Sequence, residues 1–372
     1  MVVRMSHFRV SALAWRIILC LCAMPLESRA TVPSAADVTR DIGMVFAGGP
    51  GAAGGDLNAD GSAGAADVVG VLLGLRSPTQ PGPYGVGVQR ITFTKQSVTV
   101  PGQPRVLLTD IWYPGPPGTG PTAGHPGGKL NAPLADGVHD LPLVMFSHGS
   151  CAFPEQSVFF TALLASYGFV VAAPPHPGNT ISEYATCGTP AAETDSFANR
   201  PADISFVIDA LLGMNADPSS FFFTTIDPSR IGMSGHSYGG LTTLRVSALD
   251  ARVIAGLAMA PVARSIEDEI ASIRIPTMLQ VGTLDDLQAD SELAFSLLHT
   301  PRYLLEIDHM PHLLFSDFCP ACGAGSISAD AAHLYILRHA IPFLLHWVAD
   351  DHRFDAFLSL PAAPPGVRFM TD

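Results

Sequence analysis

The chain has 372 residues, of which 48% are hydrophobic and 14% charged, and its formal net charge is −13. This length is sufficient for one large domain plus a small module, with enough apolar side chains for a sizeable core. The acidic balance disfavours nucleic acid and anionic membranes as partners, because both carry negative charge.

The first 30 residues have the pattern of an export signal. Basic residues precede a short apolar run, Ile17 to Pro25, and Ser28-Arg29-Ala30 places small residues at the two cleavage positions. The run is too short to span a membrane. We therefore expect residues 1–30 to be a signal peptide and the protein to be secreted, either extracellular or periplasmic. The alternatives are a lipid anchor on Cys20 or Cys22 and a disordered or buried N-terminal helix.

Residues 31–76 are predicted to form a small helix–calcium loop–helix module. In the stretch 56–67, oxygen-bearing side chains occupy loop positions one, three, five and twelve, and a glycine occupies position six, where the loop turns sharply. A helix is expected from Val68 to Leu75. The alternative interpretation is a polar linker. The predicted ligands of a structural Ca²⁺ are Asp56, Asn58, Asp60, Ser62 through its carbonyl, and Asp67.

The short carboxylate of Asp67 at position twelve makes this loop resemble the type I dockerin repeats. That resemblance implies a cohesin-type protein as a partner. Dockerins carry two such loops, whereas the earlier segment Ala35-Ala36-Asp37-Val38 only echoes the second half of the motif and lacks the oxygen ligands before it. One calcium loop is therefore expected.

Residues 77–83 are rich in proline and predict a stiff linker, followed by a second domain over 84–372. In this domain short apolar runs alternate with helical segments, which predicts an α/β fold with a mostly parallel sheet covered on both faces. Residues 115–136 read as a surface loop. The predicted strands are 87–93, 106–112, 141–146, 169–173, 231–233, 253–259, 277–281 and 303–307. The predicted helices are 160–167, 200–212, 241–248, 266–273, 291–298 and 332–348.

Gly235-His236-Ser237-Tyr238-Gly239 is the most informative motif, because it lies between a predicted strand and a predicted helix. A serine on such a turn is lifted clear of the sheet, and flanking glycines let the backbone segments cross closely. A serine hydroxyl is a weak nucleophile that needs a neighbouring base and an orienting carboxylate. The motif therefore predicts Ser237 as a nucleophile. The alternative is a glycine-rich loop that happens to contain a serine.

The acid and the base are expected after the later strands, in the chain order serine, acid, histidine. Asp285 follows the strand 277–281, and we choose it as the acid over its neighbour Asp286. His312 follows the strand 303–307 and is chosen as the base, because its place deeper in the loop lets the ring reach back over the serine. His309 is the alternative base.

The negatively charged oxygen formed during acyl transfer needs two backbone N–H donors. One is expected from Tyr238, which follows the nucleophile. The other is expected from Ser150, in the loop Ser147-His148-Gly149-Ser150 after the strand 141–146, where Gly149 permits close approach. His148 is expected to brace that loop.

Four cysteines remain after removal of the signal, and an even number in an exported chain predicts disulfides. Cys151 with Cys187 would join two loops near the active site, and Cys319 with Cys322 would close a local loop. A zinc site is disfavoured by the spacing. The alternative is four free buried thiols.

Three stretches then carry a resemblance to a family: 142–149, 164–174 and 235–240 are similar to the platelet-activating-factor acetylhydrolase branch of the α/β-hydrolases. The likeness extends from about Tyr84 to Leu360. It implies an esterase that acts on short or truncated acyl chains without a catalytic metal. The nucleophile, acid and base of that family fall on Ser237, Asp285 and His312.

The polyester-degrading cutinases resemble the chain in layout. They usually carry an aromatic residue at the first oxyanion position and a tryptophan after the strand that follows the helix behind the nucleophile, and these places hold Ser150 and Val262 here. The hypothesis from the sequence is a secreted carboxylic-ester hydrolase for a small-molecule or lipid ester. Cleavage of polyesters, or of lactones and amides on the same triad, is the alternative. A non-catalytic component of a calcium-dependent scaffold is the third possibility.

Overall fold

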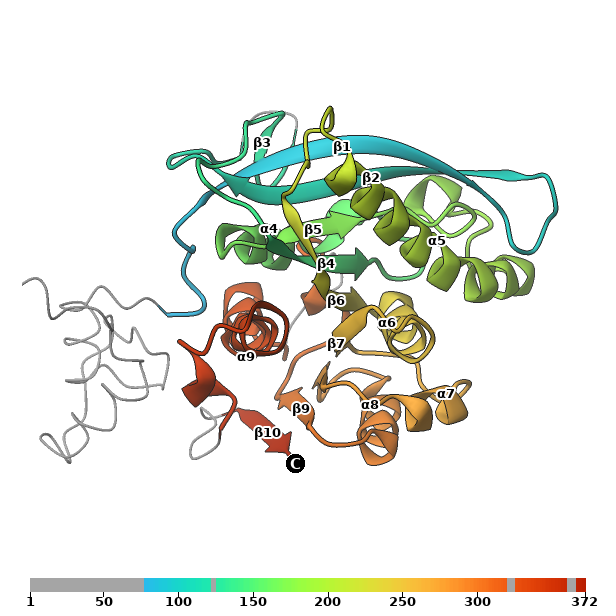
Figure 1. Cartoon of the computed structure of the whole chain (residues 1–372). Coiled ribbons are helices and arrows are strands. Elements are labelled where there is room, and N and C mark those ends of the chain that lie inside the picture. Colours follow the sequence, from blue (N-terminus) through green and yellow to red (C-terminus); the bar gives the residue numbers. More distant parts are fainter. Residues whose placement is uncertain (1–76, 122–124, 320–324, 360–365) are drawn as a thin grey trace, which may run out of the picture.

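The computed structural model describes residues 77–121, 125–319, 325–359 and 366–372 (Figure 1). The predicted signal peptide, the calcium module with its five ligands, the cohesin-type interaction and Cys322 all fall outside these residues. They stay predictions.

The described part of the chain contains one sheet of ten strands, in the order β10-β9-β8-β7-β6-β4-β5-β2-β1-β3. The central strands from β4 to β9 are mutually parallel, whereas β2 and β10 join the sheet in antiparallel orientation. The mostly parallel sheet predicted from the sequence is thereby confirmed. The strands are β1 (Gly85–Gln96), β2 (Pro104–Gly115), β3 (Lys129–Leu130), β4 (Leu141–Ser147), β5 (Val170–Ala173), β6 (Ile226–His236), β7 (Val253–Met259), β8 (Thr277–Gly282), β9 (Arg302–Ile307) and β10 (Val367–Thr371).

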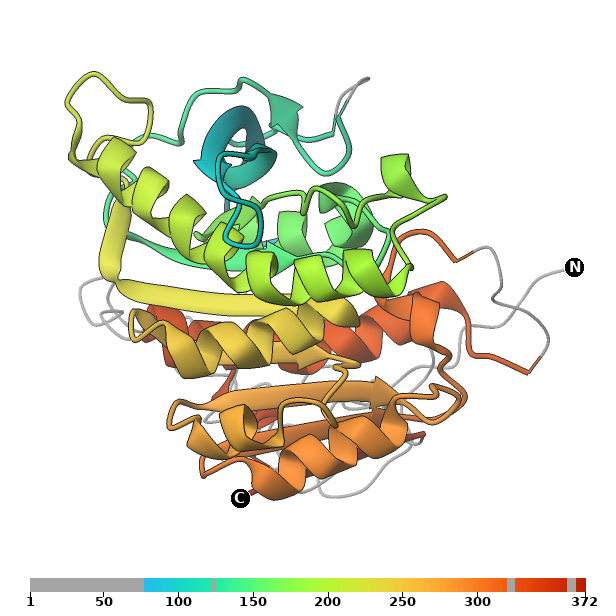
Figure 2. The same ribbon diagram turned by 90° about the vertical axis from the view of Figure 1, so that its right-hand side faces the viewer.

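Helices cover both faces of the sheet (Figure 1). One face carries α4 and α9, and the other carries α5, α6, α7 and α8, which lie side by side in Figure 2. Strands β4 and β8 are buried over their full length because both faces are covered, and this explains their continuous apolar runs. The helices are α4 (Val158–Ser166), α5 (Pro190–Ala216), α6 (Tyr238–Leu249), α7 (Glu267–Ser272), α8 (Gln288–Leu297) and α9 (Ala329–Ala349).

The helix predicted to begin at Arg200 begins ten residues earlier, at Pro190, so that prediction was wrong. The threonine before Pro190 caps the helix, and Pro201 lies inside it. A proline in a helix interior removes the N–H that would bond the carbonyl four residues back. Here that carbonyl, of Phe197, accepts a hydrogen bond from the Arg245 guanidinium instead. A tertiary contact therefore lets the helix pass through a residue that normally ends one.

Strand β3 was not predicted, because it lies in the segment 115–136 that was expected to be a surface loop. Strand β10 was not predicted either. It pairs antiparallel with β9 and extends the sheet by one strand at its edge, where Phe369 is buried. The other predicted strands and helices of the described residues are confirmed, with ends that move by a few residues. The longest change is in β6, which begins five residues before the predicted strand 231–233 and ends three residues after it, and the β1–β2 hairpin pairs over the full length of both strands.

Residues 77–83, predicted as a linker, lie against the end of α4. The Tyr167 hydroxyl donates to the carbonyls of Ser77 and Gln80, at 3.0 and 2.9 Å, and the Gly82 N–H donates to Ser166 Oγ at 2.8 Å. The segment is thus held to the large domain. Among the described helices, none combines the length and apolar character needed to cross a bilayer.

Candidate active site

Ser237 occupies the turn between β6 and α6 with φ 59° and ψ −117°. Non-glycine residues rarely adopt positive φ, and such strain is typical of functional turns. Its N–H donates to the Met259 carbonyl at 2.8 Å, which holds the turn to the neighbouring strand β7. A Cβ at Gly239 would lie 1.8 Å from the Ser147 carbonyl oxygen, so a glycine is required where the two segments cross. The strand, turn and helix occur in the predicted order.

Asp285 and His312 are brought together by the loops after β8 and β9. His312 Nδ1 donates to Asp285 Oδ2 at 2.8 Å, and Asp285 Oδ1 accepts from the Leu287 N–H at 2.9 Å. The carboxylate side chain is 1% exposed and the imidazole 30%. The alternatives, Asp286 and His309, are both exposed. The structure therefore pairs the two residues chosen first, and leaves Nε2 of His312 available for a proton.

His312 lies beside the serine turn through His236, the residue before Ser237. The two imidazole centroids are 4.5 Å apart, and His236 Nε2 donates to the His312 carbonyl at 3.1 Å. Burial, together with the nearby His312, holds the pKa of His236 well below its usual value. His236 is therefore a neutral donor that fixes the backbone of the base.

The loop after β4 carries Ser150, which is exposed at the surface of the site. Within the described residues, no hydrogen-bond acceptor faces the N–H of Ser150 or of Tyr238. The N–H of Gly149 is already used, because it donates to Gln156 Oε1 at 2.7 Å. The two N–H groups predicted as oxyanion donors are thus available to a substrate oxygen, whereas their neighbour at Gly149 is not.

His148 and Gln156 hold this loop. His148 Nδ1 donates to the Gly149 carbonyl at 2.7 Å, and its Nε2 accepts from the His176 N–H at 3.2 Å, so the ring braces the loop. Gln156 Nε2 donates to His236 Nδ1 at 2.7 Å. One glutamine side chain therefore connects the oxyanion loop to the histidine that supports the base.

Arg200 is a functional neighbour that no sequence motif predicted. Its fully buried guanidinium donates to the carbonyls of His148 and Gly149, at 2.6 and 3.0 Å, and to the side chain of Asn179. It also lies 4.8 Å from the ring centroid of Tyr238. Burial lowers the pKa of Arg200 to about 9. The side chain touches both segments that supply the N–H donors, and no local sequence pattern reveals this because the contacts are long-range.

A second histidine–aspartate pair lies behind the same loop. His176 Nδ1 donates to Asp203 Oδ2 at 3.1 Å, and its Nε2 accepts from Ser147 Oγ at 2.9 Å. Asp203 also accepts two hydrogen bonds from Arg105, at 3.0 and 2.7 Å. Burial, reinforced by Arg200, lowers the pKa of His176 to about 4. Burial by itself would raise the pKa of Asp203. The hydrogen bonds from His176 and Arg105 outweigh that effect and lower the pKa of Asp203 to about 2.

Cys151 and Cys187 form a disulfide with a Cα–Cα distance of 5.6 Å, as predicted. The bond joins the segment after the oxyanion loop to the segment before α5. Cys319 is also disulfide-bonded, and its predicted partner Cys322 lies outside the described residues.

A cavity of about 380 Å³ opens beside the acid and base. A cavity of about 420 Å³ lies elsewhere, around Arg90, Asp110 and Phe153, and contains none of the predicted catalytic or oxyanion residues. We assign the substrate to the smaller cavity because Asp285 and His312, the predicted acid and base, line it. Its lining is Leu284, Asp285, Asp286, Leu287, Pro311, His312, Leu313 and Cys319.

The fold and the known relatives define the class of protein, the carboxylic-ester hydrolases with an α/β-hydrolase fold. A solved structure of a ferulic acid esterase from Streptomyces cinnamoneus superposes with a TM-score of 0.63 at 21% identity, over 78% of this chain and 98% of that one. This likeness shows the fold.

The chain belongs to the PETase family, described as PET hydrolase-like, whose model matches residues 119–369. It is 25% identical over 276 residues to a platelet-activating factor acetylhydrolase from Cavia porcellus, and the aligned region covers 62% of this chain and 63% of that protein. It is 24% identical over 235 residues to cutinase 2 from Thermobifida cellulosilytica, covering 63% of this chain and 78% of that protein. A bis(hydroxyethyl) terephthalate hydrolase from Streptomyces coelicolor is 24% identical over 241 residues, with 63% and 66% covered. The chain thus spans less than two thirds of the length of the acetylhydrolase.

Proposed function

We propose that this protein is an exported serine hydrolase that cleaves carboxylic esters with short acyl chains. The observation that carries the proposal is the bond of 2.8 Å between His312 and Asp285, next to a serine with positive φ between β6 and α6. Ser237 is the nucleophile, His312 the general base and Asp285 the orienting carboxylate. The names of the relatives favour esters over the lactones and amides that the same triad can cleave.

In the first half-reaction, Ser237 Oγ attacks the ester carbonyl carbon while His312 Nε2 takes the hydroxyl proton. Asp285 accepts the hydrogen bond from Nδ1 and stabilises the imidazolium. The negatively charged oxygen is bound by the N–H groups of Ser150 and Tyr238. The tetrahedral intermediate collapses, and the leaving alcohol receives the proton from His312. In the second half-reaction, water attacks the carbonyl carbon of the acyl-serine while His312 Nε2 takes a proton from it. The intermediate then collapses, Ser237 Oγ receives that proton, and the carboxylic acid is released.

The direct test is Ser237→Ala with p-nitrophenyl butyrate as substrate. We expect kcat/KM to fall by about four to six orders of magnitude with an unchanged melting temperature, because only residual binding and oxyanion effects persist. Ser272→Ala, at an exposed serine, is the matched control and should keep full activity. A fluorophosphonate probe should label the wild type and the control but not Ser237→Ala. Activity of that variant within tenfold of wild type would overturn the assignment.

The preference for short chains rests on the disulfide between Cys151 and Cys187, which fixes two loops beside the oxyanion residues. A rigid mouth of this kind suits acetate to hexanoate esters and gives no interfacial activation. The chain-length profile should broaden toward longer esters in a Cys151→Ser, Cys187→Ser double variant. A maximum at palmitate in the wild type would contradict the proposal.

A polyester is the second candidate substrate, and a specific surface feature favours it. Leu284, Leu313 and Phe318 are exposed by 52%, 37% and 64%, and the two leucines line the cavity that contains His312. An apolar surface next to the base suits the flat, apolar surface of a polymer. Release of terephthalate units from a polyester film by the wild type, with loss in Leu284→Ser and Leu313→Ser, would support this candidate. Hydrolysis of bis(hydroxyethyl) terephthalate without any film degradation would restrict it to small esters.

Export and calcium binding belong to the same proposal and rest on the sequence alone. The expected cation is a structural Ca²⁺ held by the 56–67 loop, apart from the chemistry. Asp56→Ala with Asp60→Ala should abolish one calcium-binding event measured by calorimetry on the full chain. Esterase activity should survive chelation, and its loss on chelation would contradict a purely structural ion.

A further inference from the structure

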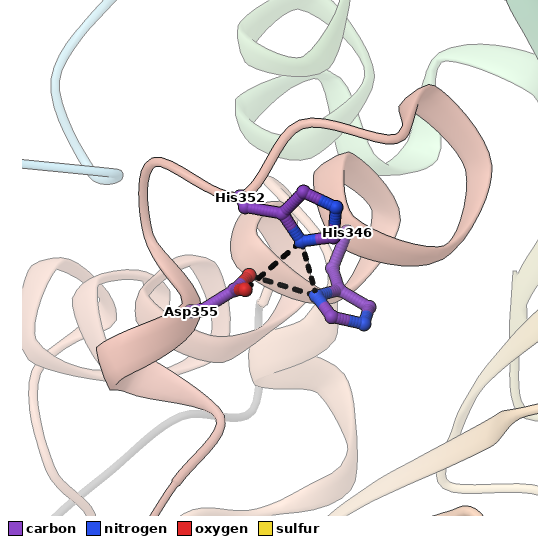
Figure 3. A group of neighbouring side chains, drawn as sticks. All are labelled: His346, His352 and Asp355. Atoms are coloured by element: carbon purple, nitrogen blue, oxygen red, sulfur yellow. Dashed lines mark hydrogen bonds and ion pairs between the residues drawn. The ribbon is translucent and has the colours of Figure 1, made fainter. Parts of the chain in front are cut away.

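Two histidines and an aspartate converge at the end of α9 (Figure 3). His346 comes from the last turn of α9, His352 from the following loop and Asp355 from the short 3-10 helix η5 (Asp355–Phe357). His346 Nδ1 lies 2.8 Å from Asp355 Oδ1, and His352 Nδ1 lies 2.9 Å from Asp355 Oδ2. The two Nδ1 atoms are 3.1 Å apart. Three side chains of metal-ligand type therefore face one another.

A fourth residue, Asp350, orients one of the rings. Its Oδ1 lies 3.1 Å from His352 Nε2, and a carboxylate can only accept, so Nε2 carries the proton and donates. His352 Nδ1 faces His346 Nδ1 and Asp355 Oδ2; without a metal ion it shares a proton with Asp355, and a bound metal ion would replace that proton on Nδ1. Histidines that bind metal ions usually donate their other ring N–H to a carboxylate in this way. The contact with Asp350 therefore fixes the orientation of one candidate ligand, in addition to the closeness of the three side chains.

The spacing also fits a metal ion. Bonds of about 2.0–2.1 Å to a tetrahedral Zn²⁺ separate neighbouring ligand atoms by about 3.3 Å. The observed separations of 2.8 to 3.1 Å require outward movements of only a few tenths of an ångström. His352 is 56% exposed, so water can reach the cluster and complete the tetrahedron. We propose that His346, His352 and Asp355 bind a divalent transition-metal ion of the zinc type, with water as the fourth ligand.

A second cluster, Asp110, His125 and Glu155, has a similar set of donors but a different partner. The Arg90 guanidinium donates to Asp110 at 2.6 and 3.1 Å and to Glu155 at 2.7 Å. An arginine therefore already supplies the positive charge there. In the cluster at the end of α9, two imidazoles face the carboxylate where the second cluster has an arginine. These side chains therefore form a set of metal-ligand type rather than an ion-pair network.

The proposed ion is structural. The start of α9 lies beside the loop that carries His309 and His312, because the Ile327 N–H donates to the His309 carbonyl at 3.0 Å. His346 lies roughly 25 Å further along the helix at about 1.5 Å per residue, too far to act on the ester. Next to Asp355, Phe354 packs on Tyr167 with centroids 6.0 Å apart, and Tyr167 holds the 77–83 segment. The ion would fasten this part of the surface to the end of α9.

The test is calorimetric titration of zinc chloride into the purified, metal-stripped full chain. Excess Ca²⁺ is present throughout, so that the 56–67 loop is not available to zinc. We expect the wild type to bind one more equivalent of zinc than His352→Ala or His346→Gln. Asp350→Asn should weaken that binding by about 10- to 100-fold, because it removes the acceptor that orients His352. The melting temperature should rise with zinc in the wild type and not in the two ligand variants.

His139→Ala is the matched control, because His139 also pairs with an exposed carboxylate, that of Asp140, outside the cluster. It should bind zinc as the wild type does. Equal zinc binding by the wild type, His352→Ala and His346→Gln would overturn the proposal, as would an equal loss in His139→Ala. Hydrolysis of p-nitrophenyl butyrate should be unchanged in all of these variants. The result for zinc is therefore independent of whether the proposed esterase activity is found.

Discussion

Among the histidine–aspartate pairs of the described residues, His312–Asp285 and His176–Asp203 share the same local geometry. In both, an imidazole Nδ1 donates to a carboxylate, at 2.8 Å for His312–Asp285 and 3.1 Å for His176–Asp203. The first pair has a partly exposed imidazole beside the serine turn, whereas the second is fully buried. Of the two imidazoles, only that of His312 is placed to act as the proposed base. A base must reach both the nucleophile and the substrate, and a buried ring only braces the backbone around it.

The largest expected effect comes from the same substitution in both pairs. His312→Gln should lower kcat/KM for p-nitrophenyl butyrate by about four to six orders of magnitude with little change in melting temperature, because the general base is lost. His176→Gln should keep activity within about tenfold and lower the free energy of unfolding by about 1–3 kcal/mol, since Ser147 and Asp203 lose a buried partner. Kinetics and thermal unfolding of the two variants measure both quantities. A comparable loss of activity in the two variants would remove the distinction.

A smaller effect is expected at Arg200, the charged neighbour of the buried pair. Arg200→Met leaves the carbonyls of His148 and Gly149 without their donor. We expect kcat to fall by about 10- to 1000-fold with little change in KM, because the oxyanion donors lose their fixed position. The free energy of unfolding should fall by about 2–5 kcal/mol.

Arg245→Met is the control for that prediction. Arg245 is also largely buried and stacks on Phe197, with the guanidinium 3.7 Å from the ring centroid, but it contacts α5 rather than the oxyanion loop. It should lose stability and keep kcat within about threefold. If both variants lose kcat equally, Arg200 has a general structural role rather than a positioning role.

The smallest expected effect is on the pH dependence of stability. The pKa of His176 is about 4 in the folded state, compared with about 6.5 for an unfolded histidine. Between these values the unfolded chain binds a proton that the folded chain excludes, so stability falls as the pH is lowered from about 6.5 to 4. His176 contributes up to about 3 kcal/mol to this loss.

His148, His236 and His339 have pKa values shifted in the same direction by burial, so the total slope is steeper than that of one histidine. His176→Gln should reduce the slope by about one proton, as measured by denaturant unfolding at several pH values. An unchanged slope would show that His176 is protonated equally in both states.

The sequence alone determined the layers of the fold and the order of its reactive residues. Continuous apolar runs such as 141–146 occur where a parallel strand is covered on both faces, and helical segments alternate with these runs along the chain. Because the carboxyl ends of parallel strands meet at one edge, Ser237, Asp285 and His312 could be selected by their places after three strands. The disulfide between Cys151 and Cys187 was one of two expected from the even number of cysteines, and the structure decided it against the alternative of free thiols.

Only the tertiary structure decided how these residues are supported. Arg200 reaches the carbonyls of His148 and Gly149, more than fifty residues earlier, and Arg245 satisfies the carbonyl that Pro201 frees inside α5. Such contacts depend on where side chains meet after the helices pack, and no local period or motif encodes them. The same holds for β10, whose pairing with β9 is set by the sheet edge. Backbone pattern is local in the chain, whereas the satisfaction of buried polar groups is a property of the packed molecule.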